Sequence, residues 1–199
     1  SKISTLKSLS IKMDTIIIVG GMANNFIQFH GNNVQGSLIE KGVENLVSDI
    51  IEFSKKNNCK IITPIDVITA KKVSKDSNPK EVGIDKIEEG EMILDIGPKS
   101  IELIKNEISN SKTVFWNGPA GVFEVPPFDK GTCEIAKFIA DLTEKKIIRS
   151  FSGGGDTIAA LEMADAKEKF TYVSTGGGAL LELLEGKKLP GLVVQNIIE

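Results

Sequence analysis

Short apolar, β-branched runs alternate with longer amphipathic stretches along this chain, and this alternation is the feature that most constrains its fold. The runs predict strands at residues 15–19, 60–63, 92–96, 113–116, 147–151 and 171–174. The stretches between them predict helices at about 22–30, 42–57, 98–110, 130–144, 156–164 and 178–185. Several runs are apolar throughout, which is typical of strands buried on both faces of a parallel sheet. We therefore predict an α/β fold with a doubly wound, mainly parallel six-stranded sheet and helices on both faces, a Rossmann-like three-layer sandwich.

One segment interrupts this rhythm. Residues 71–90 are rich in Lys, Asp, Ser and Glu. We expect an irregular surface excursion there, with one edge strand. The length of 199 residues suits a single domain with a sizeable core.

Charge and residue usage exclude several kinds of function. A formal net charge of -3 gives no general attraction to nucleic acid or to anionic membranes, so local features must hold a polyanionic ligand. Cys59 and Cys133 lie far apart and His30 is the only histidine, which argues against most zinc sites. We interpret the cysteines as two reduced thiols in a cytoplasmic protein. No apolar run reaches the ~20 residues of a membrane helix, and no signal peptide is visible.

Glycines are concentrated at the carboxyl ends of the predicted strands. They occur at Gly20-Gly21, at Gly118 and Gly121, and in the triplets 153–155 and 176–178. Ligands of open α/β sheets bind beyond these strand ends. One such loop is explained by a tight turn, but four at one edge favour a binding site.

The loop at residues 152–157 has the features of a phosphate site. Its glycines let the backbone approach a ligand closely, and the free N–H groups of the next helix point at an anion. Asp156 is then either a Mg²⁺ ligand or a carboxylate stabilised by the helix dipole, and spacing does not decide between them. In the last glycine loop, Thr175 has the place of an ordinary N-cap, while three successive glycines suggest contact with a moving phosphoryl group.

Two established nucleotide motifs are absent from the sequence. GxxxxGK[ST] does not occur, and neither does a strict GxGxxG, which weakens a dinucleotide-binding alternative. In the loop after Trp116, Asn117 could bond a phosphate oxygen and Glu124 could bond ribose. The alternative is a turn capped by Asn117, with Glu124 a solvated charge.

Five segments in order resemble the signatures of phosphoglycerate kinase over nearly the whole chain. They are Gly20-Gly21-Met22-Ala23-Asn24, Leu94-Asp95-Ile96-Gly97-Pro98-Lys99, the loop 116–124, the loop 153–157 and the segment 174–186, STGGGALLELLEG. The resemblance implies the C-terminal, nucleotide-binding domain of that family across residues 1–199. The N-terminal domain, which binds 3-phosphoglycerate, is absent from this chain by the same comparison. The implied activity is reversible phosphoryl transfer between 1,3-bisphosphoglycerate and MgADP, giving 3-phosphoglycerate and MgATP in glycolysis.

The resemblance also implies roles for particular residues. Lys2, Gly177 and Gly178 would act on the transferred phosphoryl group. Nucleotide phosphates would contact Asn117, Gly154, Gly155, Asp156 and Thr157, with Asp156 also serving Mg²⁺. Glu124 would bind the ribose. The remaining residues would shape a mostly apolar adenine slot: Gly20, Gly21, Leu38, Leu94 and Val122.

We expect a monomer that takes ADP or ATP as substrate, with Mg²⁺, and is inactive without the other domain. The alternatives are a non-catalytic nucleotide-binding module and, less favoured, a dinucleotide-dependent oxidoreductase. The family usually has a second lysine where Leu6 stands, and the interval from Thr5 to Met13 is about four residues shorter than usual. Such an interval arises from a deletion or from mobile residues missing from the sequence, and we favour the second explanation.

Overall fold

Helices and strands alternate through residues 2–176, the part of the chain that the computed structural model describes. The helices are α1 (Lys2–Leu9), α2 (Gly20–Phe29), α3 (Glu44–Lys56), α4 (Pro98–Ser109), α5 (Lys130–Glu144), α6 (Gly155–Met163) and the 3₁₀ helix η1 (Lys167–Lys169). The strands are β1 (Thr15–Ile17), β2 (Lys60–Ile62), β3 (Asp66–Ala70), β4 (Lys80–Gly83), β5 (Met92–Ile96), β6 (Thr113–Trp116), β7 (Arg149–Gly153) and β8 (Tyr172–Ser174). The helix predicted at 178–185 lies outside the described residues.

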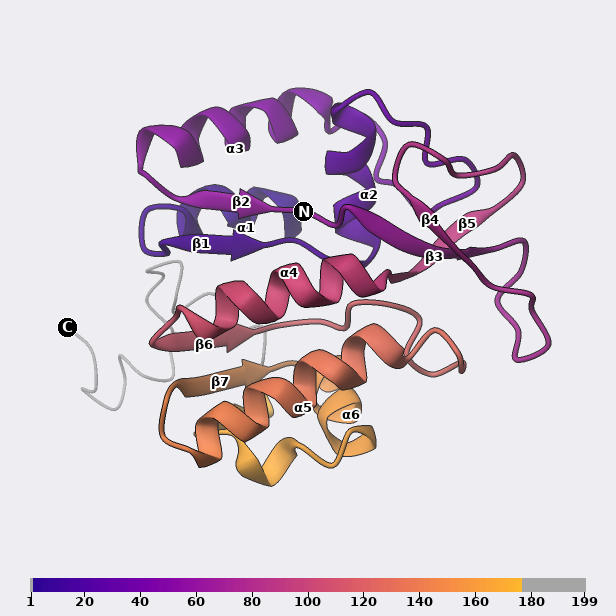
Figure 1. Ribbon diagram of the computed structural model, residues 1–199. Coiled ribbons are helices and arrows are strands. Elements are labelled where there is room, and N and C mark those ends of the chain that lie inside the picture. The colour runs from indigo at the N-terminus through magenta and orange to yellow at the C-terminus, as the bar shows by residue number, and fades with distance from the viewer. Residues whose placement is uncertain (1, 177–199) are drawn as a thin grey trace.

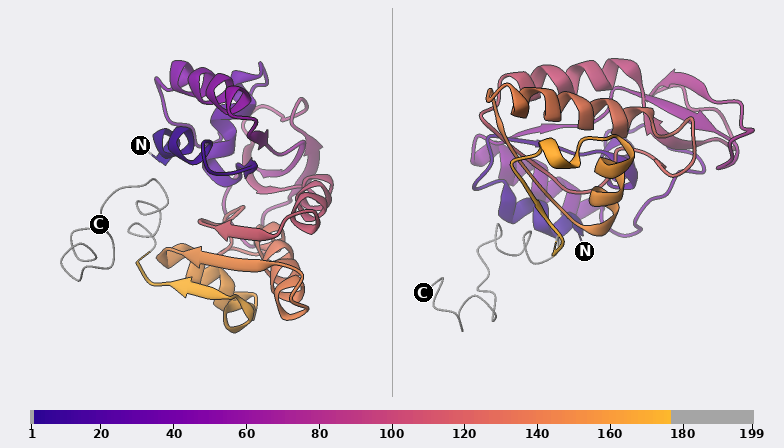
Figure 2. Two further views of the ribbon diagram at one scale, coloured as in Figure 1. Left: turned by 90° about the vertical axis from the view of Figure 1, so that its left-hand side faces the viewer. Right: turned by 90° about the horizontal axis from the view of Figure 1, so that it is seen from below.

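Parallel strands flanked by helices form the body of the molecule, which confirms the predicted α/β class. β1 pairs with β2, and β6, β7 and β8 pair in that order, all in parallel. The arrows of β1, β2, β6 and β7 point the same way in Figure 1, so their carboxyl ends lie at one side. Helices α4 and α5 run side by side (Figure 2), and α6 packs against α5. Helix α1 packs against α3 in a separate cluster with α2 and β1.

The single six-stranded sheet requires a correction at β5. This strand pairs antiparallel with β3, and β3 pairs antiparallel with β4, so the three form a sheet of their own. Strand β4 is the edge strand predicted within 71–90, whereas β3 was not predicted. An apolar run such as 92–96 indicates a buried strand but carries no information about the direction of its partner.

Helix α1 was also not predicted. It runs unbroken from Lys2 to Leu9, and its residues Ile3, Leu6 and Leu9 are buried in one cluster with residues of α2, α3 and β1. Leu6 is therefore a core residue where the family usually has a lysine.

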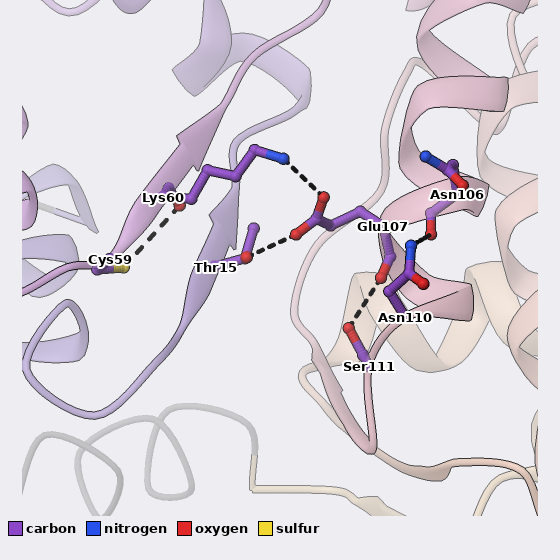
Figure 3. A network of polar contacts seen from close by, with 7 residues as sticks. All are labelled: Thr15, Cys59, Lys60, Asn106, Glu107, Asn110 and Ser111. Atoms are coloured by element: carbon purple, nitrogen blue, oxygen red, sulfur yellow. Dashed lines mark hydrogen bonds and ion pairs between the residues drawn. The ribbon is translucent and has the colours of Figure 1, made fainter.

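No backbone pairing between β1 and β6 is found in residues 2–176, and side chains of the first ladder instead contact helix α4. Glu107 of α4 accepts a hydrogen bond from Thr15 Oγ1 at 2.7 Å and pairs with Lys60 Nζ at 2.8 Å (Figure 3). The Lys60 ammonium and the Thr15 hydroxyl hold the pKa of Glu107 below its usual range. Ile17 and Val19 add apolar packing against the cluster around α4 and α5.

Two further observations bear on the sequence predictions. Both cysteines are free thiols, Cys59 buried and Cys133 half-buried. No helix within 2–176 has the length and apolar character needed to span a membrane.

Candidate functional site

Three of the four glycine loops meet at the carboxyl ends of β1, β6 and β7. A Cβ placed on Gly20 would lie 3.0 Å from the carbonyl oxygen of Pro119, so the first loop touches the second. A Cβ placed on Gly154 would lie 3.3 Å from Asn117 Nδ2, so the second loop touches the third. The fourth loop is described only as far as Gly176. Gly177 and Gly178 lie outside the described residues, as does the side chain of Lys2, whose backbone begins α1.

The amino end of α6 is open. Its N-cap is Gly154, with φ of 104°, and no side chain caps the helix. Gly155 and Asp156 in the first turn are exposed, and the N–H of Ile158 donates to the carbonyl oxygen of Gly154 at 2.9 Å. The early N–H groups of this helix therefore face solvent, with the partial positive charge that favours an anion.

The amino end of α4 is closed by the protein itself. The buried carboxylate of Asp66 accepts hydrogen bonds from the N–H groups of Lys99 at 2.9 Å and Ser100 at 2.7 Å. Gly97 permits this approach, because a Cβ there would collide with Asp66. Both helices follow a glycine after a strand, but only α6 leaves its amino end free for a ligand.

Asn117 and Thr157 hold the second and third loops together. Asn117 Nδ2 donates to the carbonyl oxygen of Gly153 at 2.6 Å, and the N–H of Gly118 donates to Thr157 Oγ1 at 2.7 Å. Thr157 is 1% exposed, whereas Asn117 is exposed. The structure therefore brings the predicted phosphate residues together, and it assigns Thr157 a buried structural contact in addition.

The residues predicted for an adenine slot occupy neighbouring positions. A Cβ on Gly21 would lie 3.3 Å from Leu38 Cδ2, and the Leu38 side chain is 77% exposed. The N–H of Val122 donates to the carbonyl oxygen of Leu94 at 2.8 Å, and Leu94 itself is buried. Leu38 thus leaves apolar surface open beside the glycine loops.

The far end of the second loop carries Glu124. Its side chain is exposed and forms no hydrogen bond or ion pair with the described residues 2–176. It remains available to a polar ligand.

Two residues without a site role predicted from the sequence lie beneath the second loop. Thr132 is fully buried in the first turn of α5, and Asp95 is 1% exposed at β5. Asp95 Oδ2 accepts the N–H of Gly131 at 2.7 Å, and Oδ1 accepts the N–H of Ile96 at 2.9 Å. The only sequence signals were a carboxylate inside an apolar run and a threonine at a helix start, and neither is specific.

Burial dominates the electrostatics of Asp95. Removal from water raises the pKa of this carboxyl to about 7, and the negative charges of Asp129 and Glu134 act in the same direction. The N–H groups of Gly131 and Ile96 oppose the shift without cancelling it. Asp95 therefore titrates near neutral pH.

The described side chains of this region do not form a complete metal site by themselves. Within residues 2–176 no three His, Cys, Asp or Glu side chains come together as a metal site. Mg²⁺ is commonly held by one or two carboxylates together with substrate phosphates. The exposed carboxylate of Asp156, beside an open helix end, fits that arrangement.

Comparisons with known proteins identify a family for the chain. The family model for phosphoglycerate kinase matches residues 1–187. The phosphoglycerate kinase of Chelativorans sp. (strain BNC1) is 44% identical over 192 residues, 96% of this chain and 48% of that protein. That of Xanthobacter flavus is 42% identical over the same length.

Solved structures show the same relationship. Phosphoglycerate kinase from Coxiella burnetii superimposes with a TM-score of 0.91 at 36% identity, covering 98% of this chain and 49% of that one. The enzyme from Pyrococcus horikoshii gives a TM-score of 0.79 at 27% identity. The chain spans about half the length of the curated relatives that it matches. On sequence and structure together, the chain belongs to the phosphoglycerate kinase family.

Proposed function

We propose that this chain is the adenine-nucleotide-binding half of a cytoplasmic, monomeric phosphoglycerate kinase. The whole enzyme transfers a phosphoryl group reversibly between 1,3-bisphosphoglycerate and MgADP, giving 3-phosphoglycerate and MgATP. The other substrate binds on an N-terminal domain that residues 1–199 do not include. The observation that carries the proposal is the uncapped amino end of α6, which lies behind Gly154 and next to Asn117.

Each part of the nucleotide has a proposed partner. The first-turn N–H groups of Gly155, Asp156 and Thr157 bind phosphate oxygens, because they have the charge and direction that an anion requires. Gly20, Gly21, Leu38, Leu94 and Val122 enclose the adenine, and Glu124 bonds the ribose. The exposed apolar surface of Leu38 supports this placement, because a stacked base would cover it.

Bound Mg²⁺ would supply positive charge that neutralises the nucleotide phosphates. Asp156 would hold it, with Asn117 placed for a phosphate oxygen. Lys2, Gly177 and Gly178 would stabilise the phosphoryl group in transfer by positive charge and N–H groups. Together these residues would position the nucleotide and neutralise the charge on the transferred phosphoryl group. No covalent enzyme intermediate is needed.

The nucleotide assignment predicts a clear order of ligand affinities. The chain is expected to bind MgADP and MgATP at one site and to bind NADH at least about tenfold more weakly, because it lacks the dinucleotide fingerprint. Titration calorimetry with each ligand measures this order. NADH binding as tight as MgADP would contradict the kinase assignment and favour the oxidoreductase alternative.

Removal of the Asp156 carboxylate separates its two possible roles. We expect Asp156→Ala to weaken MgADP about tenfold, equivalent to ~1.4 kcal/mol, and to leave metal-free ADP unchanged or tighter because a negative charge is lost. The fold should survive, since an exposed carboxylate at a helix start contributes at most ~1 kcal/mol. Asp141→Ala, which removes an exposed carboxylate on α5, is the matched control. Equal changes with and without Mg²⁺ would show that Asp156 serves only its helix.

A further inference from the structure

One buried hydroxyl group, that of Thr132, holds the loop between β6 and α5 in place through hydrogen bonds. Thr132 Oγ1 accepts the N–H of Ala120 at 3.0 Å and the N–H of Gly121 at 3.4 Å. Thr132 is 0% exposed and Ala120 is 2% exposed, so water cannot substitute for this acceptor. Loss of the hydroxyl leaves two N–H groups without this partner, and the N–H of the buried Ala120 cannot recover a bond from water.

The position of Thr132 is itself fixed by the sheet. The preceding residue, Gly131, donates its N–H to Asp95 Oδ2 at 2.7 Å. A Cβ on Gly131 would lie 2.5 Å from Asp95 Oδ1 and 2.6 Å from Ile96 Cγ1, so the first turn of α5 rests directly on β5. Strand β5 therefore fixes the position of the Thr132 hydroxyl. The hydroxyl in turn fixes the position of Ala120 and Gly121, whose N–H groups it accepts.

The fastened segment forms part of both sides of the adenine slot. Its first residue, Pro119, faces Gly20 through the carbonyl oxygen, and its last, Val122, donates to Leu94 O. Gly121 fits closely between them, since a Cβ there would lie 2.6 Å from Leu94 O. A shift of this segment would change the width of the slot, while the α6 end is attached separately through Asn117 and Thr157.

We propose that Thr132 is a positioning residue for the adenine-binding side of the nucleotide site, acting through residues 119–122. This inference rests on the proposed function. Thr132 does not contact the nucleotide in this proposal; its hydroxyl sets the distance between the loop and Gly20. The consequence is specific, because base recognition depends on Thr132 and phosphate recognition does not.

The test compares a ligand with a base to one without. Affinities for MgADP and for magnesium tripolyphosphate are measured by calorimetry on the parent chain, Thr132→Val and Thr132→Ser. Thr132→Val keeps the shape and removes the hydroxyl; we expect it to weaken MgADP at least about tenfold and tripolyphosphate less than about twofold. Thr132→Ser keeps the hydroxyl and should stay within about threefold of the parent for both ligands.

A control and a second variant make the result decisive. Thr143→Val removes a hydroxyl from the far end of α5, where Thr143 Oγ1 bonds Ile139 O and Ser150 Oγ, and should leave both affinities unchanged. If Thr132→Val does not fold, Thr132→Cys supplies a weak acceptor of similar size, and its MgADP affinity should fall below that of Thr132→Ser.

The outcomes separate this inference from the proposed function. Unchanged MgADP binding in Thr132→Val, an equal loss for both ligands, or a cysteine variant as good as the serine variant would overturn the role of Thr132. Failure of the parent chain to bind MgADP would overturn the proposed nucleotide site itself.

Discussion

The polypeptide of residues 1–199, assayed by itself, is expected to form ATP from 1,3-bisphosphoglycerate at least about 10³-fold more slowly than a full-length phosphoglycerate kinase, although it binds nucleotide. Holding two substrates in line accounts for roughly 7–11 kcal/mol of a barrier, and a chain that holds only one forfeits that contribution. The physical reason lies in the charge distribution around the glycine loops.

A substrate with several negative charges requires clustered cations. The only arginine of the chain is Arg149, which begins β7, at the end of that strand opposite to the glycine loop. There it lines a depression of about 410 Å³ with Lys112 and Lys146. Other lysines are already paired with glutamates, such as Lys60 with Glu107. We therefore expect the acyl phosphate to depend on residues outside 1–199, brought over by domain closure.

A coupled assay of ATP formation measures this difference, with the full-length enzyme of Coxiella burnetii as the comparison. Nucleotide binding by the same preparation, followed by calorimetry, shows that the chain is folded. Turnover within about tenfold of the full-length enzyme would overturn the placement of the second substrate. It would require a phosphoglycerate site on residues 1–199.

The second large effect is a loss of folding stability as the pH rises through neutrality, caused by Asp95. Its pKa is about 7 in the folded chain against 3.8 for the free side chain, so the folded state binds the proton more tightly. The stabilisation is complete below about pH 4 and disappears as the pH rises through 7. Between pH 5 and pH 8 the expected loss is on the order of 2–3 kcal/mol.

Denaturant unfolding at four pH values between 5 and 8 measures this loss, and Asp95→Asn should remove most of the slope. Glu91 and Glu107 have lowered pKa values, so their contributions are lost only in more acidic solution and do not disturb this window. Asp141→Asn, at an exposed position, should retain the slope of the parent. Parallel curves for the parent and Asp95→Asn would show that Asp95 does not titrate in this range.

Local patterns in the sequence were sufficient to predict most elements, because each depends on a few neighbouring residues. The strand at 113–116 and the helix at 130–144 were predicted with the bounds that the structure shows. Strand direction was not predictable, since an apolar run such as 92–96 fits parallel and antiparallel partners equally. Helix α1 was not predicted, because its three apolar residues are separated by two serines, a threonine and a lysine.

The candidate site was likewise only partly predictable from the sequence. Glycines at strand ends are visible in a sequence, and three of those loops do meet. The contacts beneath them are not visible: Thr132 lies 12 residues from Ala120, and Asp95 lies 36 residues from Gly131. In the sequence, each has the pattern of an ordinary core or helix residue. Its role depends on a partner that only the fold brings next to it.

Because no backbone pairing joins β1 to β6 within residues 2–176, we expect the two parallel ladders to behave as two cooperative units. Backbone amides of each ladder are protected by bonds within that ladder, so local opening can proceed between the ladders once Glu107 releases Thr15 and Lys60. Gly20 belongs to the first unit, whereas Asn117 and Gly154 belong to the second. A ligand that spans all three is therefore a cross-link between the units, and its binding free energy opposes their separation.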